Sequence, residues 1–178
     1  MELIESSQQE KIEYAGFWLR FAAFIIDRII LHIFSLILFI PTIFFVVTLA
    51  LKIEDTSNFN SFESFMAEGN LLKVGIIVGL FLLIGLLNLA AGWLYYALME
   101  SSKYNATLGK LAIGIKVTAL NGERVTFARA TGRYFARIIT NLTFLIGYVM
   151  AGFTERKQAL HDIIASCIVI KNDISSYN

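Results

Sequence analysis

The chain has 178 residues, of which 57% are hydrophobic and 16% are charged, and its formal net charge is +1. Soluble domains are usually about 45–50% apolar, so this composition argues against an ordinary soluble protein. The length leaves no room for a separate catalytic domain. The single cysteine, Cys167, excludes an internal disulfide, and we expect a buried, unreactive thiol there.

The chain begins with a polar segment, residues 1–13, which we expect to be a flexible tail and not a signal peptide, because it lacks an apolar core. A first transmembrane helix is predicted at about residues 20–51. Ile29–Leu51 runs for 23 residues without a charged side chain, which is about 34 Å of helix against a bilayer core of about 30 Å. Arg20 and Asp27 stand in the apolar sequence before this run, where a charge is costly, so each needs a partner, water or a function.

A second transmembrane helix is predicted at about residues 74–99, because Val74–Met99 is uncharged. Gly75 and Gly79 form a Gly-x-x-x-Gly pattern that allows close helix packing, although this pattern is common by chance in apolar sequence. Asn88 is strongly polar and lies in the middle of the span, so we expect it to face protein and not lipid.

The charges of the two loops differ in sign and predict the orientation. Residues 100–133 carry six basic and two acidic side chains, whereas residues 52–73 carry two basic and four acidic ones. Short loops rich in Lys and Arg stay in the cytoplasm. We therefore expect a multi-pass protein of the cell inner (cytoplasmic) membrane with a cytoplasmic N-terminus. Orientation and anionic lipid explain the basic loop better than nucleic acid does.

The second half of the cytoplasmic loop favours β-structure. Ile115–Phe127 predicts a small β-hairpin in which Asn121-Gly122 forms a type I′ turn. Ser166–Lys171 predicts a C-terminal strand that pairs with this hairpin, followed by a tail at residues 172–178.

Tyr134–Phe153 is long enough to cross a membrane but contains Arg137. A third full span would place the C-terminus outside, where the strand at residues 166–171 could not pair with a cytoplasmic hairpin. We therefore favour a broken, re-entrant helical hairpin that turns near Asn141–Thr143, with a third span as the alternative. In this interpretation the C-terminus is also cytoplasmic.

The sequence offers no recognisable set of catalytic residues, so we expect no enzyme activity. The potential metal ligands His32, His161 and Cys167 are dispersed, and we expect neither a metal nor a cofactor. Gly109-Lys110 resembles part of a phosphate-binding loop but lacks its first glycine and its final Ser or Thr.

The ionisable residues remain as the candidate site. Arg20 and Asp27 are two helical turns apart, about 10 Å along the axis, so they share a helix face but cannot pair directly. We expect Asp27 to be neutralised by Arg133 or Arg137 from another segment, or by protonation. These groups form either a structural ion pair or a proton or ion site.

An ordered series of motifs resembles the RDD family of bacterial and archaeal membrane proteins, over about residues 14–171. The matching segments are Tyr14–Asp27, Thr107–Lys110, Gly114–Val117, Asn121-Gly122, Arg129, Arg137 and Arg156–Ala165. The chain departs from the family pattern at Ser166-Cys167, where a threonine is usual.

The resemblance places the arginine and the two aspartates of the family at Arg20, Asp27 and Asp162. Some members are described as Na⁺(Li⁺,K⁺)/H⁺ antiporters, which implies transport of small cations coupled to protons. Asp27 would then bind the proton or cation, Arg20 and Arg137 would tune it, and Asp162 would couple it to the cytoplasmic side. Two spans cannot enclose a pathway, so we expect a homo-oligomer. The alternative is a non-transporting membrane scaffold or assembly factor whose Arg/Asp set is a structural ion-pair lock.

Overall fold

The computed structural model describes residues 12–54, 70–143 and 146–172, and the chain divides into two compact units. The unit that we call the mixed unit consists of the residues up to Arg28 together with those from Trp93 onward. The helical unit is Ile29–Gly92. The predicted tails at residues 1–13 and 172–178 lie almost entirely outside the described residues.

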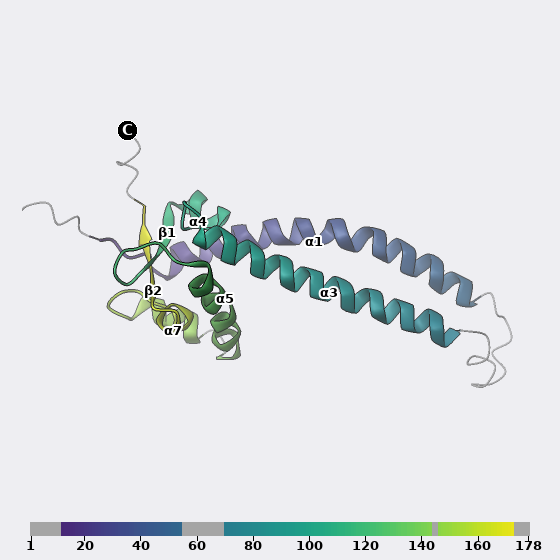
Figure 1. Cartoon of the computed structure of the whole chain (residues 1–178). Coiled ribbons are helices and arrows are strands. Elements are labelled where there is room, and N and C mark those ends of the chain that lie inside the picture. The colour runs from purple at the N-terminus through teal and green to yellow at the C-terminus, as the bar shows by residue number, and fades with distance from the viewer. Residues whose placement is uncertain (1–11, 55–69, 144–145, 173–178) are drawn as a thin grey trace, which may run out of the picture. The chain divides into compact units, whose positions relative to one another are not determined.

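Two long helices carry most of the hydrophobic sequence (Figure 1). Helix α1 is Phe17–Glu54 and helix α3 is Asn70–Ser101. Within them, Phe17–Thr48 and Leu71–Ser101 are long and apolar enough to cross a membrane, so the two predicted spans are confirmed as candidate transmembrane helices. Pro41 lies inside α1 without ending it, although proline cannot donate the usual backbone hydrogen bond.

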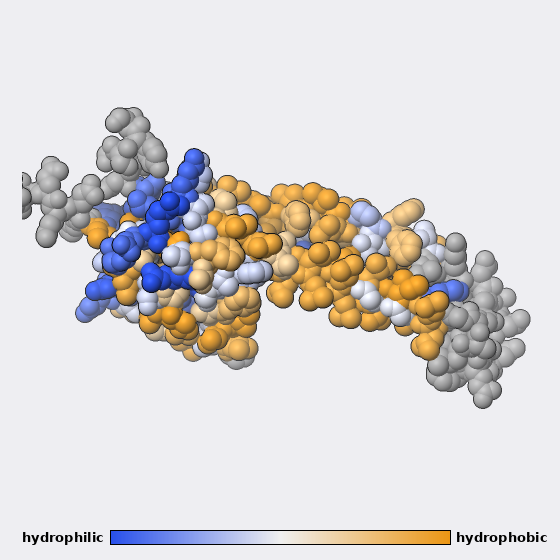
Figure 2. Space-filling view, in the orientation of Figure 1, coloured by the Kyte–Doolittle hydropathy of each residue, from blue (hydrophilic) through white to orange (hydrophobic). Residues whose placement is uncertain are grey.

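In the helical unit, apolar side chains point outward. Among its described side chains only Ile84 is buried, and Figure 2 shows hydrophobic residues covering α1 and α3. A large continuous apolar surface of this kind requires lipid or another protein around it. Asn88 Nδ2 donates to the backbone oxygen of Ile84, one turn earlier on the same helix, at 2.9 Å, and its expected position facing protein stays a prediction.

Gly75 and Gly79 have no close neighbour among the described residues. A Cβ atom placed on either glycine would meet nothing within 4 Å outside its own stretch of helix. Close packing at the Gly-x-x-x-Gly pattern therefore stays a prediction, because the described residues supply no partner for it.

The mixed unit is organised around two antiparallel strands. Strand β1, Ile115–Ala119, pairs with β2, Cys167–Lys171, with Val117 opposite Val169. The N-terminal segment joins β2 as well, because Tyr14 forms a bridge with Ile170. Three segments far apart in the sequence therefore meet at β2. The core beside them contains Ala15, Ala23, Ala97, Ile115, Val117, Val125, Ala130, Cys167 and Val169.

The predicted C-terminal strand is confirmed, but the predicted β-hairpin is wrong in its second strand. A turn does form at Asn121-Gly122, where only the glycine has a positive φ, of 82°, so the turn is not type I′. The residues directly after Glu123 do not form the expected strand. Val125 is buried in the core, and Thr126 is the N-cap of the next helix. Strand β1 consequently pairs with β2.

Helix α5, Phe127–Leu142, begins where that second strand was expected. It is followed by α6, Ile146–Val149, and the 3₁₀ turn η1, Met150–Gly152, and the chain bends by 119° between α5 and this pair. The break falls next to the turn predicted near residues 141–143. Insertion of this segment into a membrane, as a re-entrant hairpin or as a third span, stays a prediction.

Helix α5 buries polar side chains and exposes large apolar ones, which is the reverse of the pattern on a helix of a water-soluble protein. Its inner face carries four buried residues, namely Ala130, Arg133, Ala136 and Thr140. Its outer face is apolar and exposed, as a helix that meets lipid or another protein would require. The large exposed hydrophobic residues are Phe127, Phe135, Ile138, Ile139 and Leu142. Helix α5 therefore turns Arg133 toward the interior of the mixed unit, although Arg129 on the same helix is exposed.

Candidate functional site

Two of the predicted acidic residues are buried in the mixed unit, and each has its own set of partners. Asp27, on α1, is 1% exposed and accepts three hydrogen bonds. The donors are the Tyr95 hydroxyl at 2.7 Å, the Thr107 hydroxyl at 2.6 Å and the Gly109 backbone N–H at 2.8 Å. Thr107 is the N-cap of helix α4, Leu108–Ile113. Asp27 thus fastens α1 to the start of α4.

Gly109 makes this arrangement possible because it has no side chain. A Cβ atom there would lie 2.2 Å from the backbone oxygen of Ala23 and 2.8 Å from the Asp27 carboxylate. Such distances are far below van der Waals contact, so only glycine allows α4 to approach α1 this closely. The sequence comparison with a phosphate loop missed this role, in which the glycine serves helix packing.

Within the described part of the chain Asp27 does not pair with Arg133 or Arg137, the cations that the sequence suggested for it, and its protonation stays a prediction. Among the described residues, the ion pairs of Arg133 and Arg137 go to Glu100 and Asp162, and that of Arg20 goes to Asp162. The physical reason is that hydroxyl and backbone donors already satisfy both oxygens of Asp27.

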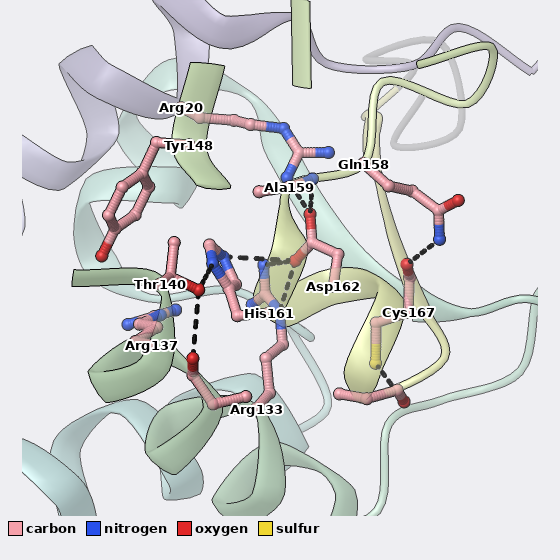
Figure 3. Close-up of polar contacts among 12 residues, drawn as sticks. Arg20, Arg133, Arg137, Thr140, Tyr148, Gln158, Ala159, His161, Asp162 and Cys167 are labelled. Carbon is pink, nitrogen blue, oxygen red and sulfur yellow. Dashed lines mark hydrogen bonds and ion pairs between the residues drawn. The ribbon is translucent and has the colours of Figure 1, made fainter. Parts of the chain in front are cut away.

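Asp162 has the ionic environment that was expected for Asp27. It lies on the short helix α7, Leu160–Ile164, has an exposed fraction of 0% and forms ion pairs with Arg20 and Arg133 (Figure 3). The Arg133 atoms Nη2 and Nε lie 2.6 and 2.8 Å from its Oδ1. Its other oxygen accepts the Ala159 backbone N–H at 3.1 Å, which helps to start α7.

Glu100, at the end of α3, is the second centre of charge. Its carboxylate lies 2.5 Å from Lys110 Nζ, 2.7 Å from Arg133 Nη1 and 2.9 Å from Arg137 Nη2. Arg133 therefore bridges Glu100 and Asp162. We use the name charged cluster for the set Arg20, Glu100, Lys110, Arg133, Arg137 and Asp162.

Arg20 also holds two backbone oxygens in place. Its Nε donates to Ala15 at 2.9 Å and its Nη2 donates to Lys157 at 2.6 Å. The first contact fixes the segment that pairs with β2, and the second fixes the loop before α7. One guanidinium thus connects three parts of the fold, a geometry that the planar fork of arginine allows.

Burial and charge change the acid–base properties of the cluster and its neighbours. Burial alone would raise the pKa of Asp162, but Arg133 and Arg20 hold it well below its usual range. Burial lowers the pKa of Lys110 to about 7, although Glu100 opposes this. Burial also lowers the pKa of His161 well below its usual value, so the imidazole is neutral. Asp162 is therefore an anion with fixed partners, and Lys110 titrates near neutral pH.

The structure brings together three of the predicted site residues, Arg20, Arg137 and Asp162, and places Asp27 beside them in a hydrogen-bonded niche. The sequence did not include Glu100 or Lys110 in the candidate site, because Glu100 was counted only as a loop charge and Lys110 was considered only as part of a phosphate loop and of a family motif. The signal that could have marked Glu100 is its position at the very end of an uncharged helix, where a carboxylate needs a partner. Among the residues with described positions, no group of three or more His, Cys, Asp or Glu could hold a metal ion.

Comparison with known proteins agrees with the resemblance. The family model described as RDD family matches residues 14–166. The chain is 38% identical over 157 residues to "Uncharacterized protein YxaI" of Bacillus subtilis (strain 168), covering 88% of this chain and 96% of that protein. It is 29% identical over 163 residues to "Uncharacterized membrane protein YteJ" of the same organism, covering 88% of this chain and 80% of that protein. No solved structure matches. With two candidate transmembrane helices, the chain is a membrane protein that belongs to the RDD family.

Proposed function

We propose that this protein is a non-transporting membrane scaffold or assembly factor, and that the charged cluster is a structural lock. The observation that carries the proposal is Arg133, buried on α5, which forms ion pairs with both Glu100 of α3 and Asp162 of α7. Arg20 attaches α1 to the same aspartate. Charged groups from four helices are thereby held in one arrangement.

Every carboxylate oxygen of Glu100 and Asp162 has a basic partner among the described residues. This complete pairing favours a fixed structure over a site that loads and releases ions. A buried ion pair is weak evidence for net stability, but removing one partner leaves the other charge buried and costs about 3–5 kcal/mol. Such a cluster selects one arrangement of helices, which is what a scaffold needs.

The strand pairing supports the orientation in this proposal. Tyr14, β1 and β2 pair with one another, so all three must lie on the same side of a membrane. The segment between β1 and β2 must then begin and end on one side, which favours a re-entrant hairpin over a third span. The basic residues of the loop at 100–133 favour the cytoplasm for that side.

Partners of this scaffold would be the lipid bilayer and further copies of the chain. The exposed apolar side chains of α1, α3 and α5 supply the surfaces for both. We propose a homo-oligomer in the inner membrane with both termini in the cytoplasm, with no enzyme activity. Labelling of a Ser175→Cys variant by a membrane-impermeant reagent tests the orientation, and labelling from outside would contradict it.

Proton-coupled transport of small cations is the second candidate. The observation that favours it is that Asp27 lines a cavity of about 220 Å³ and forms no ion pair with a described residue. In this alternative Asp27 binds the proton or cation. The residues of the charged cluster would then only support the site.

Ion flux with purified protein in liposomes separates the two candidates. The scaffold proposal predicts no Na⁺, Li⁺ or K⁺ flux above that of empty liposomes under an imposed pH gradient. Wild-type flux that Asp27→Asn abolishes, with folding preserved, would overturn the scaffold proposal. Asn88→Ala is a matched control, because Asn88 is polar but lies in the helical unit and outside the cavity.

A further inference from the structure

The outer face of helix α5 is a large exposed apolar surface. Its five large hydrophobic side chains are 42–73% exposed, from Phe127 at one end to Leu142 at the other. Helical geometry places all five within one arc of about 120° around the helix axis. The charged residues of the helix, Arg129, Arg133 and Arg137, fall outside this arc.

The end of helix α3 shows in which direction this face is turned. Trp93 of α3 meets the apolar side of α5, because its ring centre lies 6.2 Å from those of both Phe127 and Phe135. Glu100, two turns later on α3, meets the opposite side of α5 through Arg133, at 2.7 Å. Helix α3 therefore passes the side of α5, from its apolar face at Trp93 to its polar face at Glu100.

The contacts between these two points show that the helices cross at a steep angle. Tyr96, between Trp93 and Glu100 on α3, has its ring centre 5.9 Å from that of Tyr134, which lies between the two faces of α5. The indole Nε1 of Trp93 donates to the Thr131 hydroxyl at 3.3 Å. Trp93 thus contacts two full turns of α5, whereas between parallel helices the contacts would advance along both together.

The point of crossing on α3 lies at the expected edge of the membrane. The uncharged run of α3 starts at Val74, and the roughly 20 residues that a span needs end near Trp93. Tryptophan is enriched at this membrane–water boundary. Leu94 and Leu98 are exposed, so the apolar surface of α3 continues to the level of α5. The apolar face of α5 is therefore turned toward the membrane, and its Arg133 face is turned away.

We propose that α5 is an interfacial helix, which lies in the plane of the membrane with its apolar face between the headgroups and the acyl chains. The leaflet is the one in which α3 ends. Such helices bury their apolar face to a depth of about 5–10 Å. The bilayer is a better occupant than a second copy of the chain, because the face points along α3 toward the span. The inference rests on the re-entrant hairpin of the proposed function and adds the orientation of its first helix.

Spin labels along one stripe of α5 test this orientation in the full chain. Ala128, Phe135 and Leu142 are seven residues apart, so they point in nearly the same direction and are separated by about 10 Å per step. Each is replaced by cysteine in a Cys167→Ala background, labelled, and reconstituted in liposomes of phosphatidylcholine and phosphatidylglycerol. Collisions with oxygen and with a water-soluble nickel chelate give the depth of each label. An in-plane helix predicts one common depth, about 5–10 Å below the phosphates.

Arg129→Cys is the matched control, because Arg129 is exposed and adjacent to Ala128 but lies outside the apolar arc. In an in-plane helix its label should be shallower than the label at Ala128 by about 5 Å, roughly the radius of a helix. In a helix that enters the membrane end-on, two adjacent residues would have nearly the same depth. Equal depths at these two positions would therefore overturn the proposal.

Three further results would also overturn it. A depth that increases by about 10 Å per step would mean that α5 enters the membrane end-on. Three labels that are fully accessible to the nickel chelate would mean that the face lies in water. Dipolar broadening that disappears on dilution with unlabelled chain would mean that a second copy covers the face.

The Tm of each labelled variant shows whether the fold is preserved. Phe135 packs against Trp93, so Ile139→Cys, on the same face, replaces Phe135→Cys if that variant is destabilised. Failure of the in-plane orientation is distinguishable from failure of the proposed function. The hairpin is tested by labelling of Ser175→Cys from outside, and the scaffold role is tested by ion flux.

Discussion

Asp27 and Asp162 are almost equally buried, but they are stabilised in different ways. Asp162 lies between the guanidinium groups of Arg20 and Arg133, whereas Asp27 accepts hydrogen bonds from two hydroxyls and a backbone N–H. The negative charge of Asp162 is stabilised by positive charges, and that of Asp27 is stabilised by the dipoles of hydrogen-bond donors. Replacement by asparagine, which keeps the shape and removes the charge, should therefore affect the two positions unequally.

The largest effect is expected for Asp162→Asn. The amide nitrogen or the single remaining oxygen would face two guanidinium groups. Arg20 would lose its ion pair with Asp162, and Arg133 would keep only its ion pair with Glu100. Leaving a buried charge unpaired costs about 3–5 kcal/mol. Denaturation of the purified protein in detergent should show a loss of this size. A loss below about 1 kcal/mol would mean that the charged cluster is not a lock.

A second large effect is expected for Gly109→Ala, which changes the hydrogen-bonded region without touching a charge. The added methyl group would overlap the backbone of Ala23 and the carboxylate of Asp27, and overpacking of this kind costs about 1–3 kcal/mol. Gly75→Ala is the matched control, because its methyl group would meet nothing within 4 Å. Thermal denaturation of the two variants should differ clearly, and equal stability would contradict the close approach of α4 to α1.

Asp27→Asn should have a smaller effect on stability than Asp162→Asn. The asparagine oxygen can still accept from Tyr95 and Gly109, and the Thr107 hydroxyl can turn to accept from the new amide group. The loss is then that of a charge-assisted hydrogen bond, about 1 kcal/mol. Measuring both asparagine variants in the same detergent gives the comparison directly. If Asp27→Asn lowered the stability more than Asp162→Asn, hydrogen-bond donors alone would not explain how the Asp27 carboxylate is stabilised.

The sequence predicted the parts of the fold that depend on local pattern. Uncharged runs identified the two candidate spans, and the strand-like run at Ser166–Lys171 identified β2, which is Cys167–Lys171. The sequence did not predict the parts of the fold in which tertiary packing decides what a residue contacts. Val125 is typical of a strand but packs into the core, while Thr126, directly after it, caps α5.

The same limit explains the error at the candidate site. Arg133 and Arg137 are one helical turn apart on α5, which the sequence shows, but the carboxylate that each one meets is set by tertiary packing. Asp27 was expected to be neutralised by a cation or by protonation, because hydrogen-bond donors from distant segments cannot be identified along a sequence. A backbone donor such as the Gly109 N–H cannot be recognised from the composition, because every residue except proline has one.

Lys110 offers the most specific test, because it belongs to the charged cluster and directly follows Gly109 in the sequence. Its pKa of about 7 in the folded protein, lowered by burial, compares with an ordinary value of 10.5. Between these values the unfolded chain holds the proton that the folded chain has released, so stability should rise with pH, by at most about 1.4 kcal/mol per unit. Below pH 7 this dependence should vanish. The charged groups that act on Lys110 are Glu100, Arg133 and Arg137. Denaturation between pH 7 and 10 should show the rise in the wild type and a flatter profile in Lys110→Met, and parallel profiles would mean that Lys110 is not titrated in the fold.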